Sequence, residues 1–411
     1  MHKLSLTVQI TIGMFIGAIV GIFFKDWAHA GKIVGDVFLR LLQMAVVLLI
    51  LGSVIEALGS LKIQELGRLG LKTGIWFSLT TIIAAIVGLI CGLIFKPGKI
   101  IHPAKLLNNV HVGTGINWHQ TILNFFPDNI FAALAKGDDI QVIVFAIFFG
   151  IVLSQANEQG QFKQILQLIK QLNQLVVKLV MLVIKAAPLG IACLFAGTIA
   201  ANGKQIFLPL LYFLLLYAAT TVAFLTLLFV FVSLYARVSF LSLLKGLSRI
   251  ILVAFTTTSS AVTLPIEMVD AEEKLGVAKS VSQLVLPLGM ALNSNGLALY
   301  LALVCVTLMQ LYGLTATPIM LLKIILLAVL SCLGTVVVPG GGLVALSIVV
   351  PALGFPTSAI ALFAGIDWFV GMFRAVANVV GDTVTAVGVA ASTNGLNRQV
   401  YQNYKGTKNV S

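Results

Sequence analysis

The stretch TTTSSAVTLP, residues 256–265, is a polar cluster inside an otherwise apolar region. The apolar arm before it holds fewer residues than the roughly 20 that a membrane-spanning helix needs. Basic residues precede that arm, and Glu267, Asp270, Glu272 and Glu273 follow the cluster. Charged flanks around two short apolar arms predict a helical hairpin that enters and leaves one face of a membrane.

Two further interruptions lie downstream. One runs from SCLGT, residues 331–335, into PGGG, residues 339–342, again between short apolar arms. The other is LNSNGL, residues 292–297, inside a long apolar segment, where we expect the helix to unwind. Flexible loops at ordinary helix junctions would explain the polar residues but not the short arms. Broken apolar segments of this kind indicate a midplane binding site in a secondary transporter.

The composition excludes a soluble protein as the best interpretation. Of 411 residues, 59% are hydrophobic and 10% charged, and the mean hydropathy is +1.06. Spans are expected near residues 5–24, 33–58, 73–95, 140–156, 174–200, 207–236, 276–312 and 355–392. The net charge of +12 resides in short loops, so it indicates topology rather than a nucleic-acid partner. The distribution favours cytoplasmic N- and C-termini in a multi-pass inner-membrane protein in contact with the lipid bilayer.

The last apolar segment carries Asp367, Arg374, Asn378 and Asp382, spaced by 7, 4 and 4 residues, with Gly371 on the same helix face. A charge at a helix centre costs about 2.5 to 3.5 kcal/mol, so this face should border a substrate or ion path. The Arg374 fork matches a carboxylate, and Asn378 and Asp382 offer oxygens to a hard cation. Arg374 and Asp382 would lie about 12 Å apart along the helix axis, which disfavours a direct structural ion pair between them. No other partner for Arg374 is evident.

Several motifs are shared with one known family. They are FLRLL at 38–42, APLG at 187–190, SSAVTLP at 259–265, NSNGLALY at 293–300, VPG at 338–340, and the segment from GID at 365–367 to GD at 381–382. On these residues the chain resembles the dicarboxylate/amino acid:cation symporter family, which includes the glutamate transporters. The resemblance implies an all-α membrane protein with eight transmembrane helices, two re-entrant helical hairpins and inverted repeats.

The resemblance also implies a domain plan. Residues 1–72 would hold scaffold helices 1 and 2, residues 73–96 helix 3 of the transport domain, and residues 97–205 scaffold helices 4 and 5 with an external loop. Residues 206–395 would form the rest of the transport domain, and residues 396–411 a cytoplasmic tail. The family pattern further implies a homotrimer that works by elevator-type alternating access.

Site residues carried over from the family fall into two sets. Substrate would contact Ser259, Ser260, Val338 and Gly342 in the hairpins, with Arg374 on the distal and Asn378 on the proximal carboxylate. The coupling ion would be Na⁺, H⁺ or both, with no other cofactor. The implied sodium sites are Gly289, Asn293, Asn378 and Asp382; Thr80, Thr81 and Asn293; and Cys332, Leu333 and Thr335.

The chain departs from the family at informative positions. Amino-acid transporters carry an aspartate at the position of Gly371, which cannot pair with an ammonium group. The family's NMDGT motif reads NSNGL at 293–297, so Asn295 replaces a sodium-binding carboxylate and Leu297 replaces a hydroxyl. Phe77 replaces a tyrosine near the same ion site. We therefore expect fewer coupled sodium ions or a contribution from protons.

The resulting hypothesis is cation-coupled symport of a small C4-type dicarboxylate, by a protein that is not an enzyme. An acidic amino acid symporter remains the alternative if another acceptor replaces the missing aspartate. An anion channel is the remote alternative, because a polar seam with an arginine can also conduct. The histidines lie at the terminus or in expected external loops, away from any intramembrane nucleophile.

Overall fold

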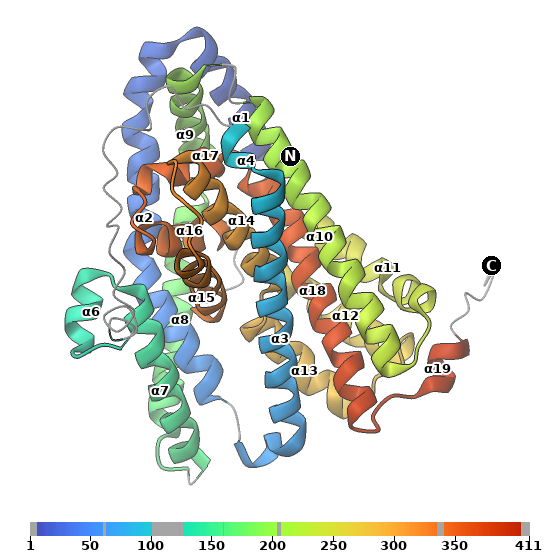
Figure 1. Ribbon diagram of the computed structural model, residues 1–411. Helices are drawn as coiled ribbons and strands as arrows, with labels where there is room; N and C mark the ends of the chain where they lie inside the picture. Colours follow the sequence, from blue (N-terminus) through green and yellow to red (C-terminus); the bar gives the residue numbers. More distant parts are fainter. Residues whose placement is uncertain are drawn as a thin grey trace, which may run out of the picture.

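The structure is a computed structural model (Figure 1). It describes residues 6–60, 63–100, 123, 126–158, 160–203, 207–334 and 341–403. Within these residues the chain is helical apart from turns, short loops and one isolated antiparallel bridge between Val277 and Leu396. The predicted all-α class is therefore confirmed at that level.

A flanking group of helices comes from the first half of the chain. It consists of α1 (Leu6–Phe23), α2 (Lys25–Gly59), α7 (Asp139–Glu158), α8 (Lys163–Ile184) and α9 (Ala187–Asn202), with α2 packing on the other four. The short α6 (Ile130–Lys136) packs on α7. Figure 1 shows the long α2 running beside α8 and α9.

Glycines set the close contact between α1 and α9. Gly13, Gly17 and Gly21 recur every four residues and face backbone carbonyls of α9. A Cβ at Gly13 would lie 2.5 Å from the Pro188 oxygen, and one at Gly21 would lie 2.6 Å from the Ala196 oxygen. Small residues at this spacing let two helix backbones approach closely in a membrane. The two helices therefore pack through their backbones.

A central group is formed by later helices together with α3 (Ile63–Phe95). Its other members are α10 (Phe207–Ala236), α11 (Phe240–Thr257), α12 (Ser260–Glu273), α13 (Lys279–Leu292), α14 (Asn295–Leu311) and α18 (Asp367–Ser392). α3 packs mainly along α14, and α18 contacts α10, α11, α13 and α14. α4 (Pro97–Ile100) continues α3 onto α14. α14 is buried over almost its whole length.

The interruptions expected from the sequence coincide with helix ends. α11 ends at Thr257, Thr258 adopts a left-handed conformation (φ 52°), and α12 begins at Ser260 against α11. α13 ends at Leu292 and α14 begins at Asn295, as expected for the LNSNGL break. α15 (Pro318–Gly334) packs on α16 (Gly341–Ala352), and the segment that joins them lies outside the described residues.

α15 also links the two groups, since it contacts α14 and α3 as well as α2 and α7. After α16 the chain forms the 3-10 turn Thr357–Ala359 (η2) and α17 (Ile360–Ala364), which packs on α9. α19 (Arg398–Asn403) follows α18. Contacts between the two groups are thus concentrated on α15 and α17.

The described residues contain six segments long and apolar enough to cross a membrane. They are Leu69–Ile100, Lys163–Ile184, Phe207–Ala236, Phe240–Thr257, Lys279–Leu311 and Asp367–Ser392. Shorter apolar helices include parts of α1, α2, α7, α9, α15 and α16. The protein is therefore a multi-pass membrane protein, whereas the eight spans and the re-entrant course of the hairpins stay predictions.

Two sequence expectations about helix length are wrong. The first arm of the 256–265 hairpin was expected to be too short to span, yet α11 has 18 residues and meets the length and hydropathy of a span. It does so because the helix includes Lys245 and Arg249. The expected span over residues 174–200 is instead two helices, α8 and α9, since Pro188 cannot donate a backbone hydrogen bond into a continuous helix.

Backbone contacts join the loop between α12 and α13 to the loop after α18. Ala278 N donates to Gly395 O at 2.8 Å, and Asn397 N donates to Gly276 O at 2.7 Å. Gly276 has φ 66°, and a Cβ there would collide with the Asn397 carbonyl. Lys72 Nζ donates to Ser392 O at 2.6 Å and adds α3 to this end of the central group.

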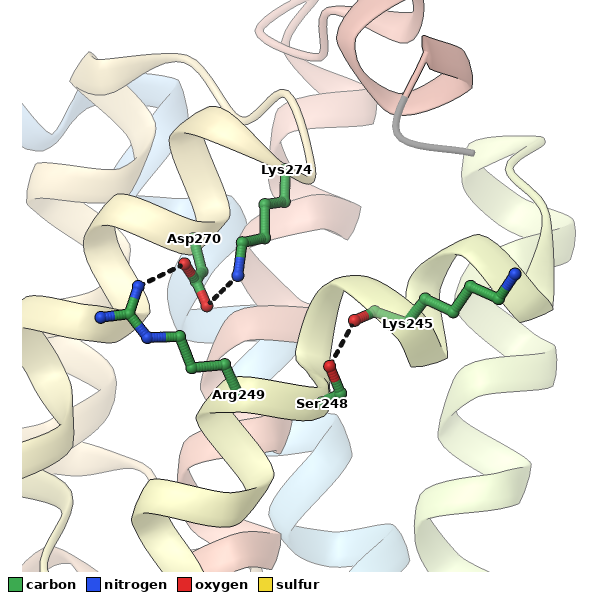
Figure 2. A network of polar contacts seen from close by, with 5 residues as sticks. All are labelled: Lys245, Ser248, Arg249, Asp270 and Lys274. Atoms are coloured by element: carbon green, nitrogen blue, oxygen red, sulfur yellow. Dashed lines mark hydrogen bonds and ion pairs between the residues drawn. The ribbon is translucent and has the colours of Figure 1, made fainter. Parts of the chain in front are cut away.

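A buried carboxylate ties α11 to α12 near the same end. Asp270, whose side chain is fully buried, accepts from Lys274 Nζ at 2.9 Å and from Arg249 Nη1 at 3.5 Å. Figure 2 shows the two cations approaching Asp270 from the two helices, with the Lys245 and Ser248 contact alongside. The pairing neutralises Asp270 inside the hairpin.

Candidate functional site

Arg374 lies two turns into α18 and forms an ion pair within that helix. Its Nη1 donates to Asp367 Oδ1 at 3.1 Å, and the two side chains are only 11% and 4% exposed. Its guanidinium carbon also lies 5.8 Å from the centroid of the Tyr300 ring on α14, within range of a cation–π contact. The guanidinium is thus buried between α18 and α14.

The sequence expectation that Arg374 lacks an evident partner is wrong. Asp367 is seven residues earlier, two helical turns away, on the face that the sequence had already indicated. Side chains on a helix lean toward its N-terminus, so a long arginine reaches back over that distance. A pair of Arg374 with Asp382, which the sequence disfavoured, is absent from the ion pairs among the described residues.

Two glycines border the Arg374–Asp367 pair. The first turn of α16 packs directly on it, since a Cβ built on Gly342 would collide with both Arg374 Nη1 and Asp367 Oδ1. Gly371 differs, because among the described residues a Cβ there would meet only Arg374 Nη2, at 3.6 Å. The guanidinium is therefore tightly covered on its Nη1 side and less crowded on its Nη2 side.

A second polar group, the amide cluster, consists of Thr81, Asn293, Asn295 and Asp382. Thr81 Oγ1 lies 2.9 Å from Asn293 Oδ1 and 3.2 Å from Asn295 Oδ1. Asn293 Nδ2 donates to Asp382 Oδ1 at 2.6 Å, and Thr80 Oγ1 lies 3.5 Å from Asn293 Oδ1. The four residues of the cluster and the neighbouring Thr80 are all buried. The break between α13 and α14 thus joins α3 to α18.

Backbone groups complete the surroundings of this break. Asn378 Oδ1 accepts from Gly296 N at 2.8 Å, and Tyr217 on α10 donates to Gly296 O at 2.9 Å. A Cβ on Gly289 would lie 2.5 Å from Asp382 Cγ, so only glycine allows this approach. Cys332 Sγ lies 3.4 Å from Ser294 O, which places the end of α15 against the same break.

The sequence-predicted hairpin residues are placed in part. Ser259 is the N-cap of α12, where its Oγ accepts from Val262 N at 3.4 Å, and Ser260 is buried. The rings of Phe255 and Phe373 meet edge to face at 5.3 Å, so the end of α11 lies beside the turn of α18 that carries Arg374. Val338 and Thr335 lie outside the described residues, and Leu333 is described only as part of the last turn of α15.

A contact that the sequence analysis missed joins the first hairpin to α18. Thr383 Oγ1 donates to Glu267 Oε1 at 2.9 Å, and Glu267 is only 1% exposed. Ser260, Thr263, Glu267 and Asp270 are spaced by 3, 4 and 3 residues, and all are buried. That helical spacing of polar residues was the available signal for a polar face turned inward.

The comparisons with known proteins agree on one family. The model of the sodium:dicarboxylate symporter family matches residues 6–392. The chain is 33% identical to the proton/glutamate-aspartate symporter of Bacillus subtilis (strain 168) over 94% of the chain and 95% of that protein. It is 31% identical to the C4-dicarboxylate transport protein of the same organism, over 95% and 94%.

A third relative is the proton/sodium-glutamate symport protein of Bacillus caldotenax, 30% identical over 94% of each chain. The relatives are transporters rather than enzymes. The match spans the ion pair, the amide cluster and both helical hairpins. The chain belongs to the sodium:dicarboxylate symporter family.

Proposed function

We propose that this protein is a cation-coupled symporter of small C4-type dicarboxylates. The observation that carries the proposal is the Arg374 guanidinium, buried between α18 and α14 with its Nη2 directed toward Gly371. A permanently charged planar fork in a buried place is suited to bidentate binding of a carboxylate. In this proposal Arg374 binds the distal carboxylate of the substrate. The Asn378 side chain, which accepts a hydrogen bond from Gly296 N, contacts the proximal carboxylate.

The choice of a dicarboxylate over an amino acid rests on Gly371. Glycine supplies no counter-charge for a substrate ammonium group, and the nearest acid on the same face, Asp367, is already paired with Arg374. An unpaired buried ammonium would cost several kcal/mol (on the order of 2 to 5). Of the three relatives described above, two bear glutamate symporter names and one a C4-dicarboxylate transporter name, so acidic amino acid symport is the competing function.

Competition in proteoliposomes tests the substrate class. The protein is reconstituted and uptake of labelled succinate is measured under imposed sodium and proton gradients, with fumarate, malate, aspartate and glutamate as competitors. We expect fumarate and malate to compete at concentrations at least about tenfold below those of the amino acids. Stronger displacement by aspartate than by fumarate or malate would favour the amino acid alternative. Accumulation against a gradient distinguishes symport from channel conduction.

The first cation position is supported by its chemistry. Asp382 is buried, and the partner closest to its Oδ1 is the neutral Asn293 amide, so this contact does not neutralise the carboxylate. The Asn378 side-chain oxygen and the backbone of Gly289 and Asn293 lie in the same region. A hard cation prefers such oxygen ligands. In our proposal a sodium ion here enters with the substrate as cargo.

The second position, Thr80, Thr81 and Asn293, fits a sodium ion poorly. Asn295 is neutral there, and its Nδ2 is a buried donor without an acceptor among the described residues. The side-chain oxygens of Asn293 and Asn295 both already accept from Thr81, so no charged oxygen and few free lone pairs are left for a cation at this position. The third position, built on Cys332, Leu333 and Thr335, lies partly outside the described residues. We infer fewer coupled sodium ions than three, with protons as the further coupling ion.

The proposed mechanism is elevator-type alternating access in a homotrimer. Residues 1–72 and 97–205 would be the scaffold, residues 73–96 and 206–395 the transport domain, and residues 396–411 a cytoplasmic tail. The packing of α3 on α14 and α18 supports assigning it to the transport domain, since most other contacts of α3 lie in the central group. Both termini would face the cytoplasm from the inner membrane. Cross-linking in native membranes, with trimers as the expected product, tests the assembly.

A further inference from the structure

Asp367 is the residue of the Arg374 region that has no role in the proposed function so far. It is the first residue of α18, its side chain is 4% exposed, and it pairs with Arg374 Nη1 at 3.1 Å. The negative charge at a helix N-terminus is also favoured by the helix dipole. The carboxylate is therefore in direct contact with the guanidinium at the start of α18.

The surroundings divide the guanidinium into two sides. On the Nη1 side, Asp367 and the first turn of α16 are in contact, and Gly342 fits only because it lacks a side chain. On the Nη2 side, the described residues leave room for at least a Cβ at Gly371, 3.6 Å from Nη2. A substrate carboxylate would therefore approach the Nη2 side.

We infer that Asp367 is a positioning and specificity-determining residue that holds Arg374 by Nη1, presents Nη2 to the substrate carboxylate, and lowers substrate affinity enough for release. The inference rests on the proposed function, because it assigns Asp367 a role in that same site. With Asp367 charged, the pair is neutral before substrate arrives. A substrate carboxylate on Nη2 therefore meets both an attractive cation and a repelling anion.

This arrangement has a kinetic consequence for a transporter. Substrate that bound an uncompensated buried arginine would dissociate slowly, because desolvated charge pairs are strong. Partial neutralisation by Asp367 weakens binding in both the loading and the releasing state. Removal of the Asp367 charge should therefore tighten binding and slow turnover together, which loss of a merely structural contact would not do.

The test compares Asp367→Asn and Asp367→Ser with the wild type in proteoliposomes by succinate uptake kinetics. We expect KM for succinate to fall about tenfold and maximal uptake to fall at least as much, because release becomes limiting. Other dicarboxylates should gain affinity alongside succinate, whereas aspartate should gain less, because its ammonium group loses a nearby negative charge. An unchanged or raised KM in the neutral variants would overturn the inference.

Two controls separate this outcome from general damage. Asp270→Asn removes another fully buried, ion-paired aspartate, at the far end of α12, and should leave KM for succinate within about twofold of wild type. Asp367→Glu keeps the charge, so KM should stay within about threefold even if maximal uptake falls. A tenfold higher KM in Asp367→Glu would also overturn the inference, and this variant decides the matter if the neutral variants do not fold. If the wild type itself does not accumulate succinate, the proposed function fails instead.

Discussion

The Arg374–Asp367 pair and the amide cluster each place a carboxylate of α18 in a buried position, but the partners of the two carboxylates differ in charge. In the pair, opposite charges lie 3.1 Å apart and cancel. In the amide cluster, Asp382 is buried beside the neutral amide of Asn293 and the hydroxyl of Thr81 holds that amide in place. The first carboxylate has a cationic partner, whereas no cationic side chain pairs with Asp382 among the described ion pairs, which leaves its oxygens available to a coupling ion. The proposed symport depends on this difference.

Loss of Arg374 should have the largest effect. Arg374→Ala removes the only guanidinium of α18, so succinate uptake should fall by more than about a hundredfold because the buried substrate carboxylate loses its partner. Uptake of succinate into proteoliposomes measures the effect. Gel filtration should show the wild-type oligomer. Arg249→Ala, which removes an exposed guanidinium from the buried Asp270, is the matched control and should retain most uptake, because Lys274 still pairs with Asp270. Undiminished uptake by Arg374→Ala would remove the basis of the substrate site.

Neutralisation of Asp382 should have the second-largest effect on uptake. Asp382→Asn keeps the shape but removes the charge that distinguishes the amide cluster from the ion pair, and gradient-driven uptake should fall by about thirtyfold or more. The concentration of sodium or protons needed for half-maximal uptake should rise. Stabilisation by sodium against heat gives a readout that is independent of transport. If Asp382→Asn kept wild-type cation dependence, the cation would have to bind elsewhere.

An acid added at Gly371 should reduce the difference in charge between the Arg374–Asp367 pair and the amide cluster. In Gly371→Asp the new carboxylate would reach Arg374 Nη2 and compete with substrate, so KM for succinate should rise about tenfold. Aspartate should gain as a competitor, because its ammonium group then finds a counter-charge. Gly371→Ala is the control for added volume and should change KM only slightly. Equal effects of both variants would show that space, rather than charge, matters at this position.

The smallest expected effect concerns Asn295. Asn295→Asp would restore a carboxylate to the amide cluster, and the sodium concentration for half-maximal uptake should fall a few-fold, about three- to fivefold. Calorimetric titration of the purified protein with sodium should show additional binding relative to wild type. Leu297→Thr changes a neighbouring residue without adding charge and serves as the control. Absence of added sodium binding in Asn295→Asp would contradict the interpretation of this position.

Local signals predicted much of the fold, and long-range packing explains what they left out. The polar break at residues 293–296 and the turn at residues 258–259 were predictable, because amides, hydroxyls and glycine interrupt apolar runs there. The division of residues 174–200 at Pro188 was missed although the proline was visible, since hydropathy alone does not place helix ends. The length of α11 was underestimated because charged residues were excluded from its apolar arm.

In the candidate site, too, local sequence signals predicted some features, and packing between distant segments determines the others. Arg374, Asn378 and Asp382 could be placed on one face from spacing alone, and the structure brings Asn378 and Asp382 to the break before α14. The partner of Arg374 was missed because a pair seven residues apart depends on how far an arginine reaches along its own helix. The contact between Glu267 and Thr383 depends on the packing of two helices far apart in sequence. Neither of these two contacts can be predicted from the helical spacing of polar residues alone.

The backbone bridge between the loops at Gly276 and Asn397 limits which parts of the molecule can shift relative to each other. Sliding of α12 along α18 would break several hydrogen bonds at once, so these helices should travel together. The larger contacts with the first-half helices are those of α15 with α2 and α7 and of α17 with α9, and smaller ones join α16 and α13 to α2 and α3 to α7. Where α17 meets α9, Gly365 presents bare backbone to the Phe195 ring, an apolar contact with little directional preference. If α17 is displaced along α9, this glycine–aromatic contact should therefore offer little directional resistance.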